Sequence, residues 1–151
     1  MKIYLMRHGE AAFNTKNDDD RELTENGRAK IKSNILLKKP ELEMVKQFLS
    51  SPIRRAQQTA DLALQTLGRS DTIESVNWLI HESSPLKSIA SLGKLKTDSV
   101  MLFSHQPFAS RFAEILCDLE LGAIGMNTAS IIAMEVDPVV AGFGKVLWQL
   151  S

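Results

Sequence analysis

The hydrophobic pattern of the chain alternates between short apolar runs and longer segments with helical spacing. The apolar runs predict strands at residues 2–6, 44–49, 73–79, 100–103, 129–136 and 146–150. The segments between them predict helices at residues 24–37, 52–67, 85–95 and 107–116. Polar residues 14–22 predict a loop after the first strand.

Proline and glycine residues mark several of the expected helix ends. Pro52 suits the first position of a helix, because its missing N–H would have had no partner there. Gly68 follows the last apolar position of that helix, and Lys39 and Pro40 close the helix before it. These signals support the helix boundaries read from the hydrophobic spacing.

Strands that alternate with helices predict a mostly parallel sheet with helices on both faces, a three-layer α/β/α sandwich. The last two strands, separated by Asp137, Pro138 and a glycine-containing turn, predict an antiparallel pair. A length of 151 residues with 44% hydrophobic residues is typical of one globular domain. We therefore expect a single domain over residues 1–151.

The charge balance narrows the range of partners. Eighteen basic and eighteen acidic residues create no net field, so we expect neither nucleic acid nor membrane as a partner, and any anion site must form locally. The apolar run at residues 3–6 is too short for a signal peptide or a membrane span, which predicts a cytoplasmic protein. The single Cys117 has apolar neighbours and is expected at a buried helix position.

Histidine and arginine side chains follow the predicted strands. Arg7 and His8 come directly after the first strand, Arg55 follows the second, and His105 follows the fourth. Because the carboxyl ends of parallel strands meet at one edge of a sheet, we expect these side chains to converge. Arginine presents a planar fork of donors that fits phosphate or carboxylate oxygens. The neighbouring Arg54 is expected instead to pair with a surface carboxylate, as most exposed arginines do.

Four segments resemble motifs of the histidine phosphatase superfamily, which includes phosphoglycerate mutases, acid phosphatases and the small SixA-type phosphohistidine phosphatases. Residues 6–10 (Met-Arg-His-Gly-Glu) are similar to its signature, and residues 104–107 (Ser-His-Gln-Pro) to its second-histidine motif. Residues 23–27 (Leu-Thr-Glu-Asn-Gly) and 51–59 (Ser-Pro-Ile-Arg-Arg-Ala-Gln-Gln-Thr) resemble two segments that lie between these motifs in the family. The likeness in order and spacing extends over almost the whole chain.

The resemblance implies a phosphoglycerate mutase-like fold and a metal-independent phosphatase that needs no cofactor. His8 would be the nucleophile, forming a phosphohistidine intermediate that water then hydrolyses. This role requires an unprotonated ring nitrogen, and nearby arginine charges are expected to hold His8 neutral near pH 7.

The same resemblance implies which side chains hold the phosphoryl group, whose transfer demands preorganised positive charge. Arg7 and Arg55 bind its oxygens, and His105, protonated by the phosphate that it faces, supplies a further donor. Arg21 matches an arginine that binds phosphate in SixA-type members. Asn14 matches an asparagine that contacts phosphate in several mutases.

The segment between the third and fourth strands bears on the substrate. Larger relatives place a carboxylic general acid there, whereas residues 78–84 offer only Glu82 or His81, without a motif match. An alkoxide needs a proton in order to leave, but imidazole, with a pKa of about 6.5, leaves far more easily. The short connection also leaves the pocket open. A phosphohistidine-bearing protein, such as a phosphorelay component, is therefore the expected substrate.

Two other interpretations stay open from the sequence. One is a phosphatase of small phosphomonoesters that uses Glu82 as its general acid. The other is a noncatalytic module that binds phosphorylated partners. The acidic run at residues 18–20 could suggest a metal site, but consecutive side chains rarely point at one centre. We expect this run to be a solvated part of the loop.

Overall fold

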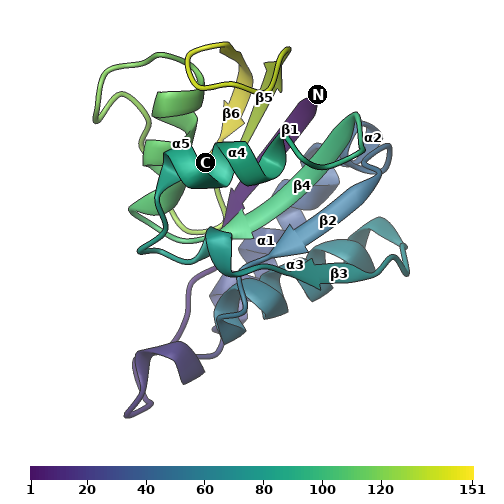
Figure 1. Ribbon diagram of the computed structural model, residues 1–151. Coiled ribbons are helices and arrows are strands. Elements are labelled where there is room, and N and C mark those ends of the chain that lie inside the picture. The colour runs from purple at the N-terminus through teal and green to yellow at the C-terminus, as the bar shows by residue number, and fades with distance from the viewer.

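Six strands form one sheet in the order β3-β2-β4-β1-β5-β6 in the computed structural model, which describes residues 1–151 (Figure 1). They are β1 (Lys2–Arg7), β2 (Gln47–Ser50), β3 (Ile73–Ser75), β4 (Ser99–Ser104), β5 (Ile131–Val136) and β6 (Gly144–Leu150). β1 to β4 are parallel, β5 is antiparallel to β1, and β6 is antiparallel to β5. The predicted parallel sheet and its antiparallel pair are confirmed.

Helices cover both faces of the sheet: α1 (Glu25–Leu37), α2 (Lys39–Leu42), α3 (Arg54–Leu67), α4 (Pro85–Leu92) and α5 (Phe108–Leu116). Two short 3-10 helices, η1 (Asp18–Asp20) and η2 (Asn77–Leu79), lie in the connections. α1 and α3 pack together on one face, and α4 and α5 pack on the other (Figure 1). No helix combines the length and the apolar character that a membrane crossing requires.

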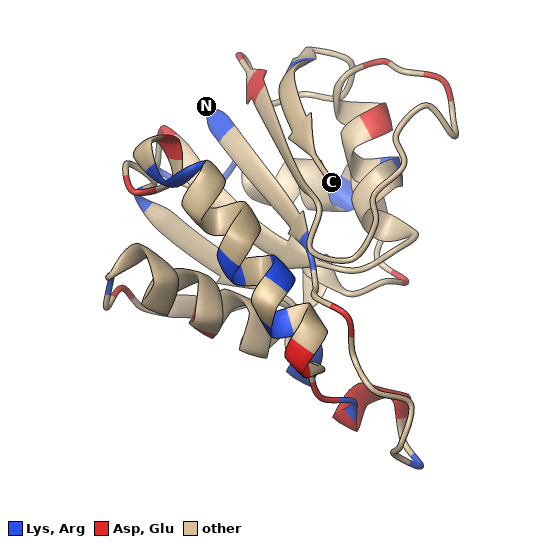
Figure 2. Ribbon diagram, turned by 180° about the vertical axis from the view of Figure 1, so that it is seen from behind, with Lys and Arg blue, Asp and Glu red and all other residues tan.

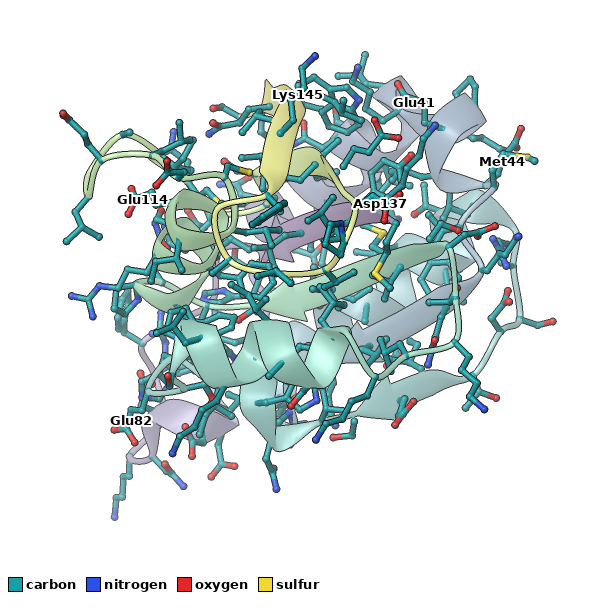
Figure 3. The ribbon with its side chains drawn as sticks, turned by 45° about the horizontal axis from the view of Figure 1, so that its top comes forward. Glu41, Met44, Glu82, Glu114, Asp137 and Lys145 are labelled. Atoms are coloured by element: carbon teal, nitrogen blue, oxygen red, sulfur yellow. The ribbon has the colours of Figure 1, made fainter.

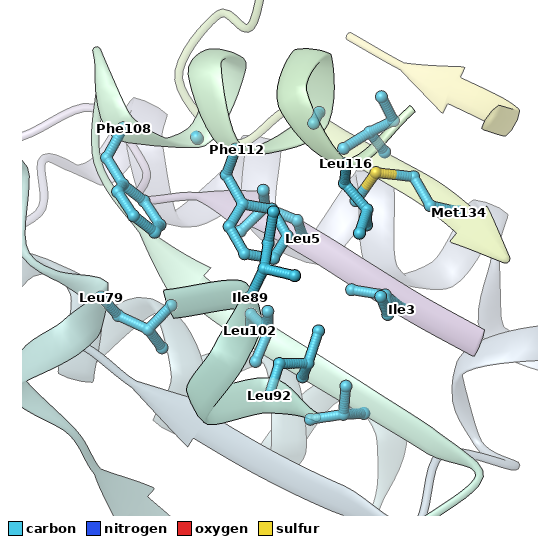
Figure 4. Close-up of a cluster of buried hydrophobic side chains, with 14 of the residues drawn as sticks. Ile3, Leu5, Leu79, Ile89, Leu92, Leu102, Phe108, Phe112, Leu116 and Met134 are labelled. Carbon is cyan, nitrogen blue, oxygen red and sulfur yellow. The ribbon is translucent and has the colours of Figure 1, made fainter. Parts of the chain in front are cut away.

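Two hydrophobic cores lie on opposite faces of the sheet, and β1 contributes to both. Ile3 and Leu5 pack with α4 and α5, as Figure 4 shows for this core, while Tyr4 and Met6 pack with α1 and α3. This division follows from the two-residue period of a strand, which points successive side chains to opposite faces. A strand buried on both faces holds the residues that follow it in a fixed place.

Local signals explain several helix ends. The Thr24 hydroxyl accepts a 2.9 Å hydrogen bond from the Gly27 N–H and caps α1. Gly68 ends α3 in the left-handed conformation at φ 73°. Gly27 also lies so close to the backbone of Glu10 that a Cβ atom would collide with it. The segment 23–27 therefore anchors α1 against the chain that leaves β1.

Some predicted boundaries were wrong. Pro52 does not begin α3, because the Ser51 hydroxyl accepts a 3.2 Å bond from the Ile53 N–H and holds a turn before the helix. The predicted strand 73–79 divides into β3 and η2 after Val76, whose N–H makes a last bond to Ser50 O. Residues 44–46 precede β2, and residues 93–95 lie beyond α4. The helix expected to close before Lys39 and Pro40 does end at Leu37, but Pro40 lies within a separate short helix, α2.

Candidate active site

The order of the strands places the two histidine motifs side by side. β1 and β4 are adjacent and parallel, with Arg7 paired to Ser104, so His8 and His105 leave the sheet at the same level. Both side chains are buried, and their ring centres are 5.1 Å apart. Arg55 comes from the first turn of α3, which follows β2 on the other side of β4. The predicted convergence of these residues is present.

Hydrogen bonds assign the tautomer of His8. Its Nδ1 lies 2.7 Å from the carbonyl oxygen of Gly9, which can only accept, so Nδ1 carries the proton. Nε2 is then unprotonated, and it accepts a 3.2 Å bond from Nε of Arg55. The Thr59 hydroxyl fixes both partners, since it accepts from the Gly9 N–H at 3.1 Å and donates to Arg55 O at 2.7 Å. His8 thus presents a lone pair toward an arginine.

Burial is the main reason why His8 is neutral. It lowers the pKa of His8 to about 4, although the bond to Gly9 O raises that pKa. The positive charges of Arg55, Arg7 and Arg21 lower the pKa further. The prediction that arginines hold His8 neutral is therefore correct in direction, but desolvation by the surrounding chain is the larger effect.

His105 is also neutral in the free protein. Burial, followed by the nearby His8 and Arg55, lowers the pKa of His105 to about 3. Its Nε2 lies 2.8 Å from the Ser51 hydroxyl. Its Nδ1 is enclosed and has no hydrogen-bond partner. The protonated His105 expected from the sequence would therefore require a bound anion beside it that raises this pKa.

Asp18 bridges Arg55 and Arg21. Arg55, whose side chain is only 6% exposed, donates from Nη1 to Asp18 O at 2.8 Å and from Nη2 to Asp18 Oδ2 at 3.1 Å. Asp18 Oδ1 accepts a 3.1 Å bond from Nη1 of Arg21. That bond is the main reason why the pKa of Asp18 is lowered. The acidic run is exposed, as expected, and the Asp18 side chain is 60% exposed. Its carboxylate also bridges the two arginines expected to bind phosphate.

Arg21 holds the loop around Asp18. It donates from Nε to Ala12 O and from Nη2 to Ala11 O, each at 2.9 Å. Its guanidinium carbon lies 3.7 Å from the ring centre of Phe13, an 86% exposed residue. The acidic turn η1 projects from the body of the fold in Figures 1 and 2. Arg21 thus ties Asp18 in the projecting loop to the chain at residues 11–13, where the loop begins.

Arg7 reaches the site from the end of β1. Its Nη1 donates a 2.9 Å bond to Met126 O, while its Nε is buried without a partner. The loop that carries Met126 is fixed by the buried Glu114, whose Oε1 accepts from the N–H groups of Gly122 at 2.9 Å and Ile124 at 3.0 Å. Arg7 is therefore positioned by a segment more than a hundred residues away in sequence.

Other candidate residues differ in how close they come to this cluster. Asn14 is exposed and makes no side-chain hydrogen bond. Arg54 forms an ion pair with Glu22, as expected. Glu82 is 79% exposed and lies 3.6 Å from Nε2 of His81, whose ring packs edge-on against His105. Cys117 is buried, as predicted, but it lies at the cap directly after α5 and not within the helix.

Several contributors were missed by the reasoning from sequence. Ser51 and Thr59 lie inside the motif 51–59, so a signal for them existed, although it indicated no particular role. Asp18 and Glu114 had no motif, and only the folded chain brings them to arginine or backbone partners.

A hollow of about 590 Å³ lies away from this cluster. Residues Tyr4, Glu41, Met44, Lys46, Asp98 and Glu135 are among those that line it. Figure 3 shows Glu41 and Met44 at the opposite end of the molecule from Glu82. The chemistry-bearing residues therefore gather at the carboxyl edge of the parallel strands and not in this hollow.

The neutral histidines predict a loss of stability in mild acid. Unfolded histidines bind protons below about pH 6.5, whereas folded His8 and His105 do so only near pH 4 and pH 3. Stability is therefore fully present above pH 6.5 and falls as the pH drops through this window, by on the order of 2 kcal/mol per histidine at pH 5.

Urea unfolding at pH 7 and pH 5 measures this effect. A His8→Gln variant serves as the matched control, and its stability should fall less between the two pH values. Equal stability of the wild type at pH 7 and pH 5 would contradict a buried, neutral pair.

Comparisons with known proteins show the family of the chain. A family model described as the histidine phosphatase superfamily (branch 1) matches residues 3–79. Phosphohistidine phosphatase SixA of Escherichia coli (strain K12) is 31% identical over 161 residues, which cover 100% of this chain and 94% of that protein. The structure of the protein histidine phosphatase SixA complexed with tungstate has a TM-score of 0.91 at 28% identity, covering 100% of this chain and 97% of that one.

A more distant structure shares the fold alone. A mycobacterial glucosyl-3-phosphoglycerate phosphatase complexed with VO3 has a TM-score of 0.73 at 17% identity, and the match covers 99% of each chain. The family match spans β1 to η2 and so includes His8, Arg21 and Arg55, while the full-length similarity also includes His105. On this evidence the chain belongs to the histidine phosphatase superfamily (branch 1).

Proposed function

We propose that the chain is a phosphohistidine phosphatase, which transfers a phosphoryl group from a protein histidine to His8 and then to water. The observation that carries the proposal is the buried, neutral His8, with its proton on Nδ1 and its Nε2 lone pair beside Arg55. The similarity to SixA supports the substrate class, because that relative is named as a phosphohistidine phosphatase. Tungstate, the anion in the related structure, is a tetrahedral oxyanion like phosphate.

Substrate binding begins with an exchange of anions. The phosphoryl group displaces the Asp18 carboxylate and takes the bonds that Arg55 and Arg21 give to it in the free protein. Arg55 Nε moves its bond from His8 to a phosphoryl oxygen, which frees the Nε2 lone pair. Arg7 and the unpartnered Nδ1 of His105 supply the remaining donors. The positions of these groups around His8 support the proposed roles.

Transfer to His8 yields an intermediate that water can hydrolyse. Nε2 attacks phosphorus in line, the bond from phosphorus to the substrate nitrogen breaks, and its electron pair stays on the substrate ring. With a proton on its other nitrogen, that ring leaves as neutral imidazole. His8 keeps its Nδ1 proton on Gly9 O. When water attacks the phosphorylated His8, the Nε2 bond breaks and returns a neutral imidazole, which is a good leaving group.

The surroundings of the site fit a substrate on a protein surface. Only residues 80–84 connect η2 to α4, so no inserted domain covers the histidines at this point. The projecting loop on the other side (Figure 1) carries Phe13, which is 86% exposed. A phosphohistidine-bearing protein, such as a phosphorelay component, can approach between them. We propose no cofactor or metal for this reaction.

The test compares two substrates. Wild-type protein is incubated with a phosphohistidine-bearing phosphotransfer protein and with p-nitrophenyl phosphate, and kcat/KM is measured for both. We expect a preference of about 100-fold or more for the phosphohistidine protein, because its leaving group is imidazole and the Glu82 carboxylate is turned to solvent.

A preference for the ester would instead support a phosphomonoester phosphatase. Binding of vanadate without turnover of either substrate would support a noncatalytic module.

A further inference from the structure

Phe13 is the most exposed of the large hydrophobic side chains, with 86% of its surface in solvent. Single exposed apolar residues are common on protein surfaces, so the place of this one decides what it can do. It follows the nucleophile His8 closely in sequence, at the start of the loop that projects from the fold (Figure 1). Its ring centre is 3.7 Å from the guanidinium carbon of Arg21. The exposed ring is therefore stacked on a side chain that is expected to bind phosphate.

The base of the projecting loop holds this ring in place. The Ala12 N–H donates to Glu22 O at 2.8 Å, which joins the two sides of the loop. Arg21 then donates to the carbonyl oxygens of Ala11 and Ala12, each at 2.9 Å. Phe13 comes directly after these residues and covers a guanidinium that is fixed by them. An aromatic side chain positioned in this way loses little conformational freedom when a partner covers it.

Contacts within the loop connect Phe13 with the nucleophile. The Arg21 guanidinium donates to Asp18 Oδ1, and Asp18 Oδ2 accepts from Arg55. Arg55 in turn donates to Nε2 of His8. A phosphoryl group that replaces the Asp18 carboxylate on these arginines is then separated from the Phe13 ring only by the Arg21 guanidinium. Because a histidine side chain is short, a protein that carries this phosphoryl group has to bring its own surface against the loop.

The acidic turn of the same loop limits the kind of surface that fits. None of the three aspartates of η1 is buried. Asp18 is engaged with the arginines, whereas the carboxylates of Asp19 and Asp20 form no ion pair with the chain. Lys16 is the one basic residue among residues 13–20, so this part of the loop has a net negative charge, and Figure 2 shows the acidic turn projecting from the body. The complementary surface has an apolar contact for the exposed ring and lysine or arginine side chains beside it.

We propose that Phe13, together with the acidic pair Asp19 and Asp20, is the docking element for the phosphohistidine-bearing protein. This inference rests on the proposed function and states how the protein substrate is recognised. Phe13 supplies an apolar anchor, as aromatic residues do at the centres of protein interfaces. Asp19 and Asp20 attract a basic surface and raise the rate of association. Both effects act on binding of the substrate protein and not on the transfer to His8.

Two substrates with the same leaving group test the anchor. One is a phosphohistidine-bearing phosphotransfer protein, and the other is free phosphohistidine, which has no protein surface. We expect Phe13→Ala to lower kcat/KM for the protein about 30-fold, chiefly through KM, because an interface anchor is lost. For free phosphohistidine kcat/KM should change less than about 3-fold, since the backbone bonds of Arg21 remain. Phe13→Leu, which keeps an apolar side chain, should recover most of the loss.

Phe143→Ala is the matched control for the anchor. Phe143 is 60% exposed in the turn between β5 and β6, at the edge of the sheet where β1 begins. It is therefore an exposed phenylalanine at the opposite edge from the histidines. This variant should keep wild-type kinetics on both substrates.

The acidic pair is tested by Asp19→Asn combined with Asp20→Asn. The double variant should have a lower kcat/KM for the protein at low ionic strength, and added salt should remove its difference from the wild type. Wild-type kinetics of the double variant at low salt would exclude the pair from docking.

Three results would overturn the docking proposal. Equal losses of Phe13→Ala on both substrates would mean that the ring only supports Arg21, and unchanged kinetics on both would leave it no part in recognition. Conversion of a wild-type dimer into a monomer by Phe13→Ala would assign the loop to a second copy of the chain. A wild type that turns over neither phosphohistidine substrate refutes the proposed function and the docking element with it. Turnover of both substrates without a selective effect of Phe13→Ala refutes the docking element alone.

Discussion

His8→Ala is expected to reduce turnover of the phosphohistidine protein roughly 1,000-fold or more, because loss of a nucleophile removes the covalent route altogether. Nε2 of His8 carries the lone pair that faces Arg55, and the bond from Nδ1 to Gly9 O sets the tautomer of the ring. The measurement is steady-state turnover combined with mass spectrometry of the quenched enzyme. The wild type should carry an acid-labile phosphoryl group on His8, and the variant should carry none.

The fold of this variant needs its own check, since His8 is buried. Circular dichroism and urea unfolding at pH 7 should show a native chain, and His8→Gln, which retains more of the side-chain volume, gives a second variant. A folded His8 variant that keeps its turnover, or a phosphoryl label on another residue, would refute His8 as the nucleophile.

Arg55→Ala is expected to lower kcat/KM by roughly 100- to 1,000-fold, through loss of preorganised charge at the transferring phosphoryl group. Arg55 contacts both the nucleophile and the projecting loop, through its bonds to His8 and Asp18. Removing its charge should also raise the pKa of His8, since that charge lowers it in the wild type. Vanadate binding should weaken in parallel.

The neighbouring arginine provides the matched control. Arg54 precedes Arg55 on α3 but is exposed and paired with Glu22, so Arg54→Ala should keep nearly wild-type turnover and vanadate affinity. Equal effects of the two variants would show that general positive charge on α3 matters, and not the contacts of Arg55. Arg55→Ala with normal turnover would remove this residue from the site.

The convergence of the site could be predicted because it depends on short-range signals and on topology. β1 and β4 are apolar runs that end abruptly in Arg7-His8 and Ser104-His105, and parallel strands in an α/β fold place such ends at one edge. Arg55 was predictable as well, since the turn after β2 leads into α3 at this edge. Arg54 was expected to point away from this edge, because successive residues of a helix point in different directions.

The contacts that tune the site depend on tertiary structure. Asp18 meets Arg55 only because the loop after β1 folds back toward α3, which no periodicity in residues 14–22 indicates. The depth of burial that lowers the pKa of His8 requires the whole packed core. Glu114 reads as an ordinary helix residue, although its carboxylate fixes a loop by two backbone bonds. Long-range pairing of this kind leaves no local pattern.

The Asp18 bridge makes Asp18 an intramolecular competitor of any anion that binds the two arginines. Because the carboxylate is attached to the chain, it competes for Arg55 and Arg21 at a fixed effective concentration. A small singly charged anion from solution offers these arginines nothing that Asp18 does not already offer. We expect a phosphoryl dianion, which brings a second charge and a third oxygen, to displace the tether more effectively than such an anion. In the proposed mechanism the returning carboxylate would then help to expel the phosphate product, which would give an open site selectivity and turnover without a closing lid.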